Sequence, residues 1–158
     1  MIRAWRLARR VHSDPPRKRA FDGYGSQLYG NRWNSIGLPA AYASSTRSLC
    51  ALEYLAHLDP DVLPDDLVFA EIGFDASHVE RVARLPPGWD DEGSPQAATF
   101  GDTWLRERRS VVLEVPSVIV ITEVNYVINP RHPDFSSLTI AATLDDFAFD
   151  ERLFKKKP

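Results

Sequence analysis

Residues 39–58 read PAAYASSTRSLCALEYLAHL, and their pattern indicates the architecture of the chain. Residues 39–44 predict a short strand, and Ser45 or Thr46 then offers a hydroxyl that can cap the first turn of a helix. The run TRSLCALEYLAHL fits that helix, which the Asp-Pro pair at 59–60 ends. We therefore expect a strand that leads directly into a helix.

Apolar runs on either side of this stretch predict further strands and a second helix. Ser94 followed by Pro95 predicts the start of a helix that runs to about Arg108. Strands and helices are mixed without a regular alternation, so we expect a single-domain α+β fold with a mixed sheet rather than a doubly wound one. The predicted strands are residues 2–8, 67–74, 111–115, 118–121 and 126–128, with 137–144 as a further one.

The composition is that of one globular domain. The chain has 158 residues, of which 44% are hydrophobic and 26% charged, which suits a single domain over 1–158 with its core at about 3–154. The last four residues, KKKP, predict a frayed tail at 155–158. Cys50 is the only cysteine, so an intrachain disulfide is excluded. No apolar run is long enough for a signal sequence or a membrane helix, and we expect a cytoplasmic protein without a membrane partner.

Charge is distributed unevenly along the chain. Residues 1–32 carry eight Lys or Arg against Asp14 and Asp22, whereas residues 33–158 are acidic overall. A basic segment on an acidic body is typical of a protein that binds an anion near that segment. A phosphate-bearing small molecule and a nucleic acid both fit, and a solvated basic loop is the alternative.

Residues 9–38 lack a clear period and predict a long loop, of a kind that is usually functional. Within it, residues 23–34 read GYGSQLYGNRWN. Glycines allow a ligand to approach the backbone closely, and the Arg32 guanidinium can fork onto phosphate or carboxylate oxygens. The segment matches neither a Walker loop nor a dinucleotide-binding fingerprint, so a glycine-rich turn with a surface arginine remains an alternative.

Glu53 is unusual for its place on the predicted helix. It lies about 40° around the helix from Leu49 and about 60° from Ala56, at the edge of the apolar face. A carboxylate there needs partners or stays neutral. His57, four residues on, can be its local partner, and an edge glutamate that reaches water or an arginine is the structural alternative.

Other catalytic arrangements are not indicated. The four histidines, at 12, 57, 78 and 132, have no zinc-ligand spacing, and one cysteine provides no thiolate cluster, so we expect no metal site. The chain has no Gly-x-Ser-x-Gly elbow, and Ser117 after Pro116 is typical of a turn.

Several short motifs occur in a defined order and resemble the RES-domain family. The family is named for an Arg, a Glu and a Ser, which match here as Arg32, Glu53 and Ser117. The match covers nearly the whole chain. Its motifs are Arg6 in Trp-Arg, GYGSQLYGNRWN (23–34), AYAS (41–44), LCALE (49–53), FGDTWL (100–105), VPS (115–117) and NPRHP (129–133).

The resemblance implies a fold similar to that of ADP-ribosyltransferases and a toxin of a toxin–antitoxin pair that consumes NAD. It implies NAD as a substrate rather than a prosthetic group, and an Xre-like helix-turn-helix antitoxin as the partner, with any contact to nucleic acid made through that antitoxin. The residues expected to be catalytic are Arg32, Tyr42 and Glu53. Those expected to bind NAD are Arg6, Tyr29, Arg32, Tyr42 and Ser117.

Cleavage of the nicotinamide–ribose bond passes through an oxocarbenium-like transition state, which a carboxylate stabilises. Glu53 suits this role, Tyr42 can stack on nicotinamide, and Arg32 can clamp the diphosphate. The acceptor stays open between water, phosphate and a protein, the last of which makes the chain an ADP-ribosyltransferase. Two further alternatives are a nucleic-acid-binding module and an inactive protein that only binds its partner.

Overall fold

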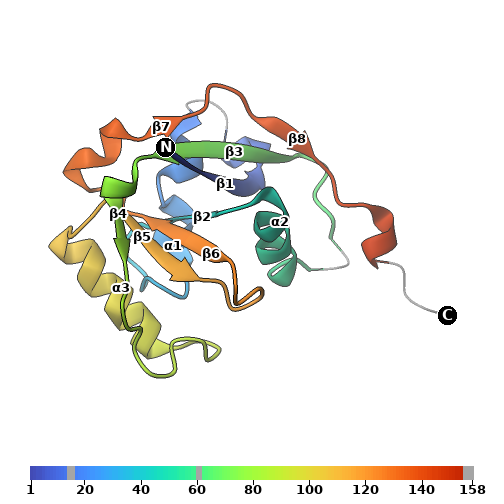
Figure 1. Ribbon diagram of the computed structural model, residues 1–158. Helices are drawn as coiled ribbons and strands as arrows, with labels where there is room; N and C mark the ends of the chain where they lie inside the picture. Colours follow the sequence, from blue (N-terminus) through green and yellow to red (C-terminus); the bar gives the residue numbers. More distant parts are fainter. Residues whose placement is uncertain (14–16, 60–61, 155–158) are drawn as a thin grey trace.

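The computed structural model describes residues 1–13, 17–59 and 62–154 of the chain. Eight strands form one curled sheet with three α-helices around it (Figure 1). The strands are β1 (Ile2–Arg9), β2 (Ala41–Ser44), β3 (Leu67–Phe74), β4 (Val79–Arg81), β5 (Val112–Pro116), β6 (Val124–Ile128), β7 (Thr139–Ile140) and β8 (Asp145–Phe147). The helices are α1 (Tyr24–Tyr29), α2 (Arg47–Ala56) and α3 (Pro95–Glu107).

The sheet order is β4-β5-β6-β2-β1-β3-β7. Strand β8 pairs with the same edge of β3 as β7 does, at the other end of β3. Only the β4–β5 pair is parallel; all the other pairs among the described residues are antiparallel. The expected α+β class with a mixed sheet is therefore confirmed. The short 3-10 helices are Arg10–His12, Arg17–Phe21, Ala76–His78, Pro133–Ser137 and Glu151–Phe154.

The two longer helices begin where the sequence indicates. The Thr46 hydroxyl accepts a hydrogen bond from the Leu49 amide and caps α2, and the Ser94 hydroxyl caps α3 just before Pro95. Leu49 and Cys50 are buried residues of α2 itself. In Figure 1, α2 stands beside β2 and β6, while α3 lies along β4 and β5. The two helices thus bury opposite parts of the sheet.

Helix α3 packs directly on the loop that precedes β2. A Cβ atom on Gly101 would lie 1.9 Å from the carbonyl oxygen of Trp33, so only glycine permits this approach. The buried Asp102 carboxylate accepts a hydrogen bond of 2.8 Å from the Ser35 amide. The FGDTWL motif therefore fixes the position of residues 33–35.

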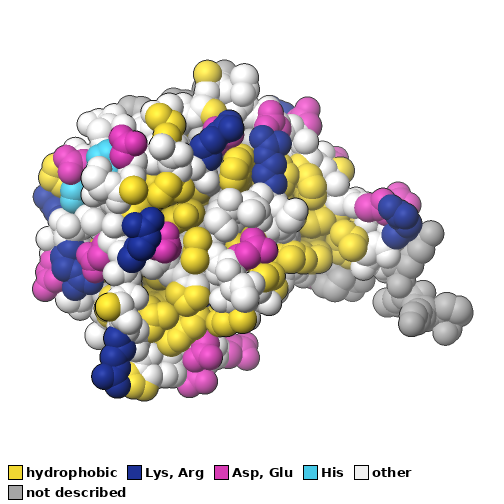
Figure 2. All heavy atoms as spheres, viewed as in Figure 1, with side chains coloured by type: hydrophobic (Ala, Val, Ile, Leu, Met, Phe, Trp, Pro, Cys, Tyr) yellow, Lys and Arg dark blue, Asp and Glu magenta, His cyan; other side chains and the backbone are white. Residues whose placement is uncertain are grey.

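Several sequence predictions need correction. Residues 118–121 are not a strand but the tip of the β5–β6 connection, because the Ser117 hydroxyl accepts hydrogen bonds from the Ile119 and Val120 amides and turns the chain. Figure 2 shows hydrophobic side chains at the surface where Figure 1 places this connection, and Ile121 is 66% exposed. Residues 137–144 contain only the two-residue strand β7.

The predicted loop at 9–38 holds α1 and two 3-10 helices, since glycines at 23 and 30 bracket a short helical run that has no apolar period. Strand β4 was not predicted. The expected tail at 155–158 lies outside the described residues. Among the described helices, none is long and apolar enough to cross a membrane.

Candidate active site

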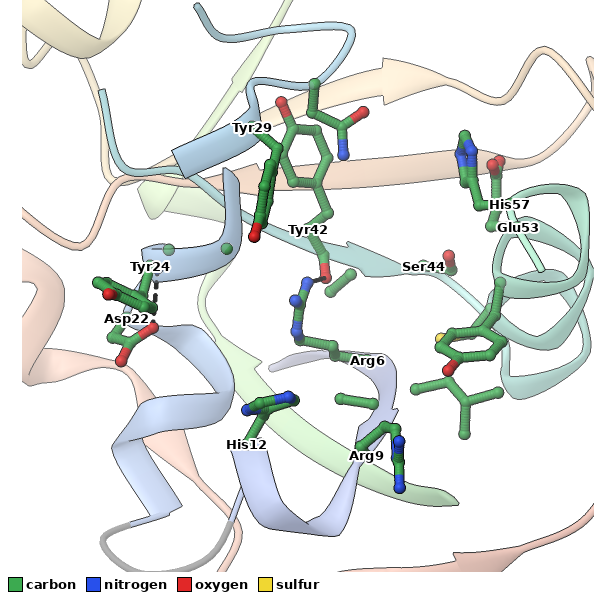
Figure 3. Close-up of a pocket in the computed structure, with 18 of the residues that line it drawn as sticks. Arg6, Arg9, His12, Asp22, Tyr24, Tyr29, Tyr42, Ser44, Glu53 and His57 are labelled. Carbon is green, nitrogen blue, oxygen red and sulfur yellow. Dashed lines mark hydrogen bonds between the residues drawn. The ribbon is translucent and has the colours of Figure 1, made fainter. Parts of the chain in front are cut away.

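A pocket of about 630 Å³ opens between β1, β2, α1 and α2 (Figure 3). Its volume is in the range of small-molecule sites. In Figure 3, Arg6 lies near the centre of the labelled residues, Glu53 and His57 project from α2 on one side, and Asp22 and Tyr24 lie on the other. Four of the residues predicted from the sequence line this pocket, namely Arg6, Tyr29, Tyr42 and Glu53.

Glu53 is held through one of its two carboxylate oxygens. Oε1 accepts a hydrogen bond of 2.7 Å from the Ser117 hydroxyl and one of 2.6 Å from the Asn125 side-chain amide. No residue in the described ranges donates to Oε2. The half-buried carboxylate is thus fixed in position, with one oxygen left for a ligand.

Asn125 is itself oriented by Ser44. The Ser44 hydroxyl donates to Asn125 Oδ1 at 2.7 Å, so the amide nitrogen faces Glu53. Ser44 and Asn125 are register partners of the β2–β6 pair. The sheet register, rather than any local motif, therefore brings this donor to the carboxylate.

The Tyr42 side chain is held on the wall of the pocket by two hydrogen bonds of its hydroxyl group. Its hydroxyl donates to Asn34 Oδ1 at 2.7 Å and accepts a hydrogen bond from the Trp33 amide at 3.2 Å. Burial raises the pKa of the Tyr42 hydroxyl, which stays protonated at neutral pH. Because the hydroxyl is engaged by the loop, the ring of Tyr42 is the part available to a ligand.

Arg6 is a half-buried cation in the lining of the pocket. Its Nη1 atom donates to the Tyr42 carbonyl at 3.2 Å, and among the described residues no carboxylate lies within ion-pair distance of it. Burial lowers the pKa of the guanidinium. An arginine has five N–H donors, and desolvated charges are costly when unpaired. Arg6 therefore favours an anionic group in the pocket.

The other two predicted site residues lie outside the pocket lining. Nη1 of Arg32 donates to the carbonyl oxygens of Trp89 (2.8 Å) and Asp91 (2.7 Å), while the neighbouring Trp33 ring stacks on Trp89 at 5.8 Å. Ser117 is buried behind Glu53. The structure thus brings Tyr42, Glu53 and Arg6 to one pocket and places Arg32 against the loop at 86–93.

Sequence reasoning missed Asn125 and Ser44, which belong to strands 81 residues apart. A polar residue opposite another polar residue in an otherwise apolar sheet is the signal that could have found them, once the strand pairing was known. Cys50 also lines the pocket, where burial raises the pKa of its thiol to about 11, so the thiol is unreactive at neutral pH.

The chain is similar to known proteins in sequence and in fold. The family model described as "RES domain" matches residues 3–150. A protein named "Prs ADP-ribosylating toxin" from Sphingobium sp. (strain YBL2) is 36% identical over 140 residues, which cover 85% of this chain and 86% of the relative. A protein named "Toxin Res" from Photorhabdus laumondii is 35% identical over 142 residues, which cover 87% of this chain and 90% of the relative.

One solved structure shares the fold. A chain in the crystal structure of the M. tuberculosis MbcT–MbcA toxin–antitoxin complex matches with a TM-score of 0.68 over 96% of this chain and 86% of that chain. The sequence identity is 15%, so this likeness concerns the fold alone.

Proposed function

This chain belongs to the RES-domain family, and on that basis we propose that it is an enzyme that cleaves the bond between nicotinamide and ribose in NAD. The observation that carries the proposal is the Glu53 carboxylate, which is held through Oε1 and presents Oε2 to the pocket. A negative charge fixed in advance stabilises positive charge that develops on the ribose.

In the proposed reaction, nicotinamide leaves with the electron pair of the C–N bond, an acceptor oxygen forms a bond to the ribose carbon from which it departed, and the proton of that acceptor passes to solvent. Glu53 Oε2 accepts hydrogen bonds from the ribose hydroxyls and stabilises the oxocarbenium-like transition state. The Tyr42 ring supports nicotinamide by stacking. Arg6 pairs with the diphosphate, which supplies the anion that this half-buried cation lacks. NAD is a substrate in this scheme.

Transfer of ADP-ribose to a protein is the second candidate, and one specific observation favours it. The relative from Sphingobium carries the name "Prs ADP-ribosylating toxin" and matches most of this chain. Both candidates share the first bond cleavage and differ only in the acceptor, which is water or phosphate in one and a protein side chain in the other. The role of Glu53 is the same in both.

We further propose that the chain is a cytoplasmic toxin with a protein antitoxin. Two relatives are named as toxins, and the solved structure with the same fold is a toxin–antitoxin complex. The expected Xre-like helix-turn-helix identity of the antitoxin rests on the family resemblance. Expression of the chain alone should arrest growth, and coexpression with its antitoxin should relieve the arrest.

Product analysis tests the proposed reaction. Purified protein is incubated with adenine-labelled NAD in three buffers: without phosphate, with phosphate, and with host extract. We expect release of nicotinamide in at least one buffer. Label in free ADP-ribose, in its phosphorylated form, or on a protein band then identifies the acceptor. No nicotinamide in any buffer would exclude the proposal.

A further inference from the structure

One end of the pocket is not used by the proposed bond cleavage. Asp22 and Tyr24 line it on the side away from Glu53 (Figure 3). Tyr24 is 59% exposed and its ring has no aromatic partner among the described residues. An exposed aromatic face on the edge of a pocket is a surface on which a flat ring can stack.

This end is preorganised by the backbone. Gly23 has a left-handed φ of 71°, and a Cβ atom there would lie 2.6 Å from the Ala40 nitrogen, so the turn before α1 fits closely against the residue that precedes β2. The Tyr24 amide donates to Asp22 Oδ1 at 2.9 Å. The carboxylate is therefore oriented next to the Tyr24 ring, and no described residue donates a hydrogen bond to its Oδ2 atom.

Arg6 separates this end from the Glu53 end in Figure 3. Asp22 contributes to the electrostatic environment of Arg6, which is consistent with the two side chains facing the same cavity. A dinucleotide has the same order, with a diphosphate between two nucleosides. A diphosphate next to Arg6 and a ribose next to Glu53 leave the second nucleoside at Asp22 and Tyr24.

We propose that this end of the pocket binds the adenine of the substrate, with the base stacked on Tyr24 and its exocyclic amine donating a hydrogen bond to Asp22. The identity of the ligand rests on the proposed function. The substrate class is then an adenine dinucleotide, and nicotinamide mononucleotide or a hypoxanthine dinucleotide is a poor substitute. Hypoxanthine presents a carbonyl oxygen to the Asp22 carboxylate in place of the amine.

The stacking contact is tested by calorimetry with two partial ligands, ADP-ribose and nicotinamide mononucleotide. Tyr24→Ser should weaken ADP-ribose binding about 5- to 150-fold, the range for one stacked base. It should leave the affinity for nicotinamide mononucleotide unchanged. Ile36→Ser is the matched control, because Ile36 is 72% exposed nearby and does not line the pocket. Equal ADP-ribose affinity in wild type and Tyr24→Ser would overturn the proposal.

The polar contact is tested by exchanging the base. Wild type should bind ADP-ribose about tenfold more tightly than inosine diphosphate ribose, because one hydrogen bond to a charged group is lost and a repulsion is added. Asp22→Asn should remove or reverse this preference, since an amide can also donate to the carbonyl oxygen. A preference that is the same in wild type and Asp22→Asn would contradict the role of Asp22.

These binding tests do not depend on turnover. If ADP-ribose binds as described but NAD is not cleaved, the adenine site stands and the proposed function fails. If NAD is cleaved while Tyr24→Ser and Asp22→Asn bind like wild type, the proposed function stands and the adenine site fails. Absence of ADP-ribose binding to wild type also overturns the adenine site.

Discussion

Asn125→Asp should turn the proposed activity into one that is lost as pH rises. In the wild type, the Asn125 amide donates to Glu53 Oε1 at 2.6 Å, and the Ser44 hydroxyl donates to Asn125 Oδ1. An aspartic acid keeps the bond from Ser44 and can replace the amide donor only while it carries a proton. Two carboxylates in this contact cannot both ionise without cost, so they share one proton at low pH.

The size of the effect follows from the contact distance. Two unit charges at the observed 2.6 Å repel by about 1.6 kcal/mol in a water-like medium and by about 6 kcal/mol at an effective dielectric constant of 20. This repulsion moves the loss of the shared proton into the range of about pH 5 to 9. Once the proton is lost, Glu53 Oε1 has no donor at residue 125 and is repelled from the position that this donor fixes. A hydrogen bond to a charged group contributes about 1.5–3 kcal/mol, which corresponds to about a tenfold or greater loss of activity.

Stability should follow the same curve. The folded protein raises the pKa of the new pair above its unfolded value, so the folded state binds more protons and the stabilisation present at low pH is lost as pH rises. The assay is nicotinamide release and melting temperature of Asn125→Asp relative to wild type from pH 5 to pH 9. A constant activity ratio over this range would refute the role given to Asn125, and so would a folded variant that is inactive at pH 5.

Three further substitutions separate the roles of the arginines and of Ser117. Arg6→Met should weaken ADP-ribose binding by roughly 10- to 100-fold without lowering the melting temperature, because it removes a half-buried cation that has no carboxylate partner. Arg3→Met is the control, because Arg3 lies on the same strand and its guanidinium pairs with Glu71 outside the pocket. Arg32→Ala should lower NAD affinity and melting temperature together, because the Arg32 guanidinium holds the loop at 86–93. A loss of affinity with an unchanged melting temperature would show instead that the guanidinium contacts the ligand. Ser117→Ala should cost activity less than about a hundredfold, because Asn125 still donates to Glu53, and a larger loss in folded protein would show that the hydroxyl has a greater role.

Local patterns in the sequence account for the elements that depend on local chemistry. The hydroxyl at Thr46 caps α2, and Ser94 with Pro95 starts α3, as their capping signals predict. The edge position of Glu53 on α2 follows from helical periodicity. Failures occur where one residue overrides the pattern: the β-branched run at 118–121 predicts a strand, but the Ser117 hydroxyl binds two amides and makes it a turn.

The surroundings of Glu53 could not be predicted in the same way. Asn125 reaches it only because β2 pairs with β6 in the register that sets Ser44 opposite Asn125. The direction of the Arg32 side chain likewise depends on a loop more than 50 residues further along the chain, whose carbonyl oxygens it binds. Contacts set by strand register and by loop docking are not encoded in a single local motif.

In the proposed reaction, Glu53 stabilises the charge that develops when the nicotinamide–ribose bond breaks. Steady-state nicotinamide release by Glu53→Gln tests it most directly, with Glu123→Gln as a control carboxylate on the β5–β6 connection outside the pocket lining. A glutamine oxygen can still accept from Ser117 and Asn125, so the melting temperature should change little. We expect kcat to fall about 100-fold or more while KM changes little, because the charge exists only in the transition state. A folded Glu53→Gln protein that releases nicotinamide at the wild-type rate would contradict it.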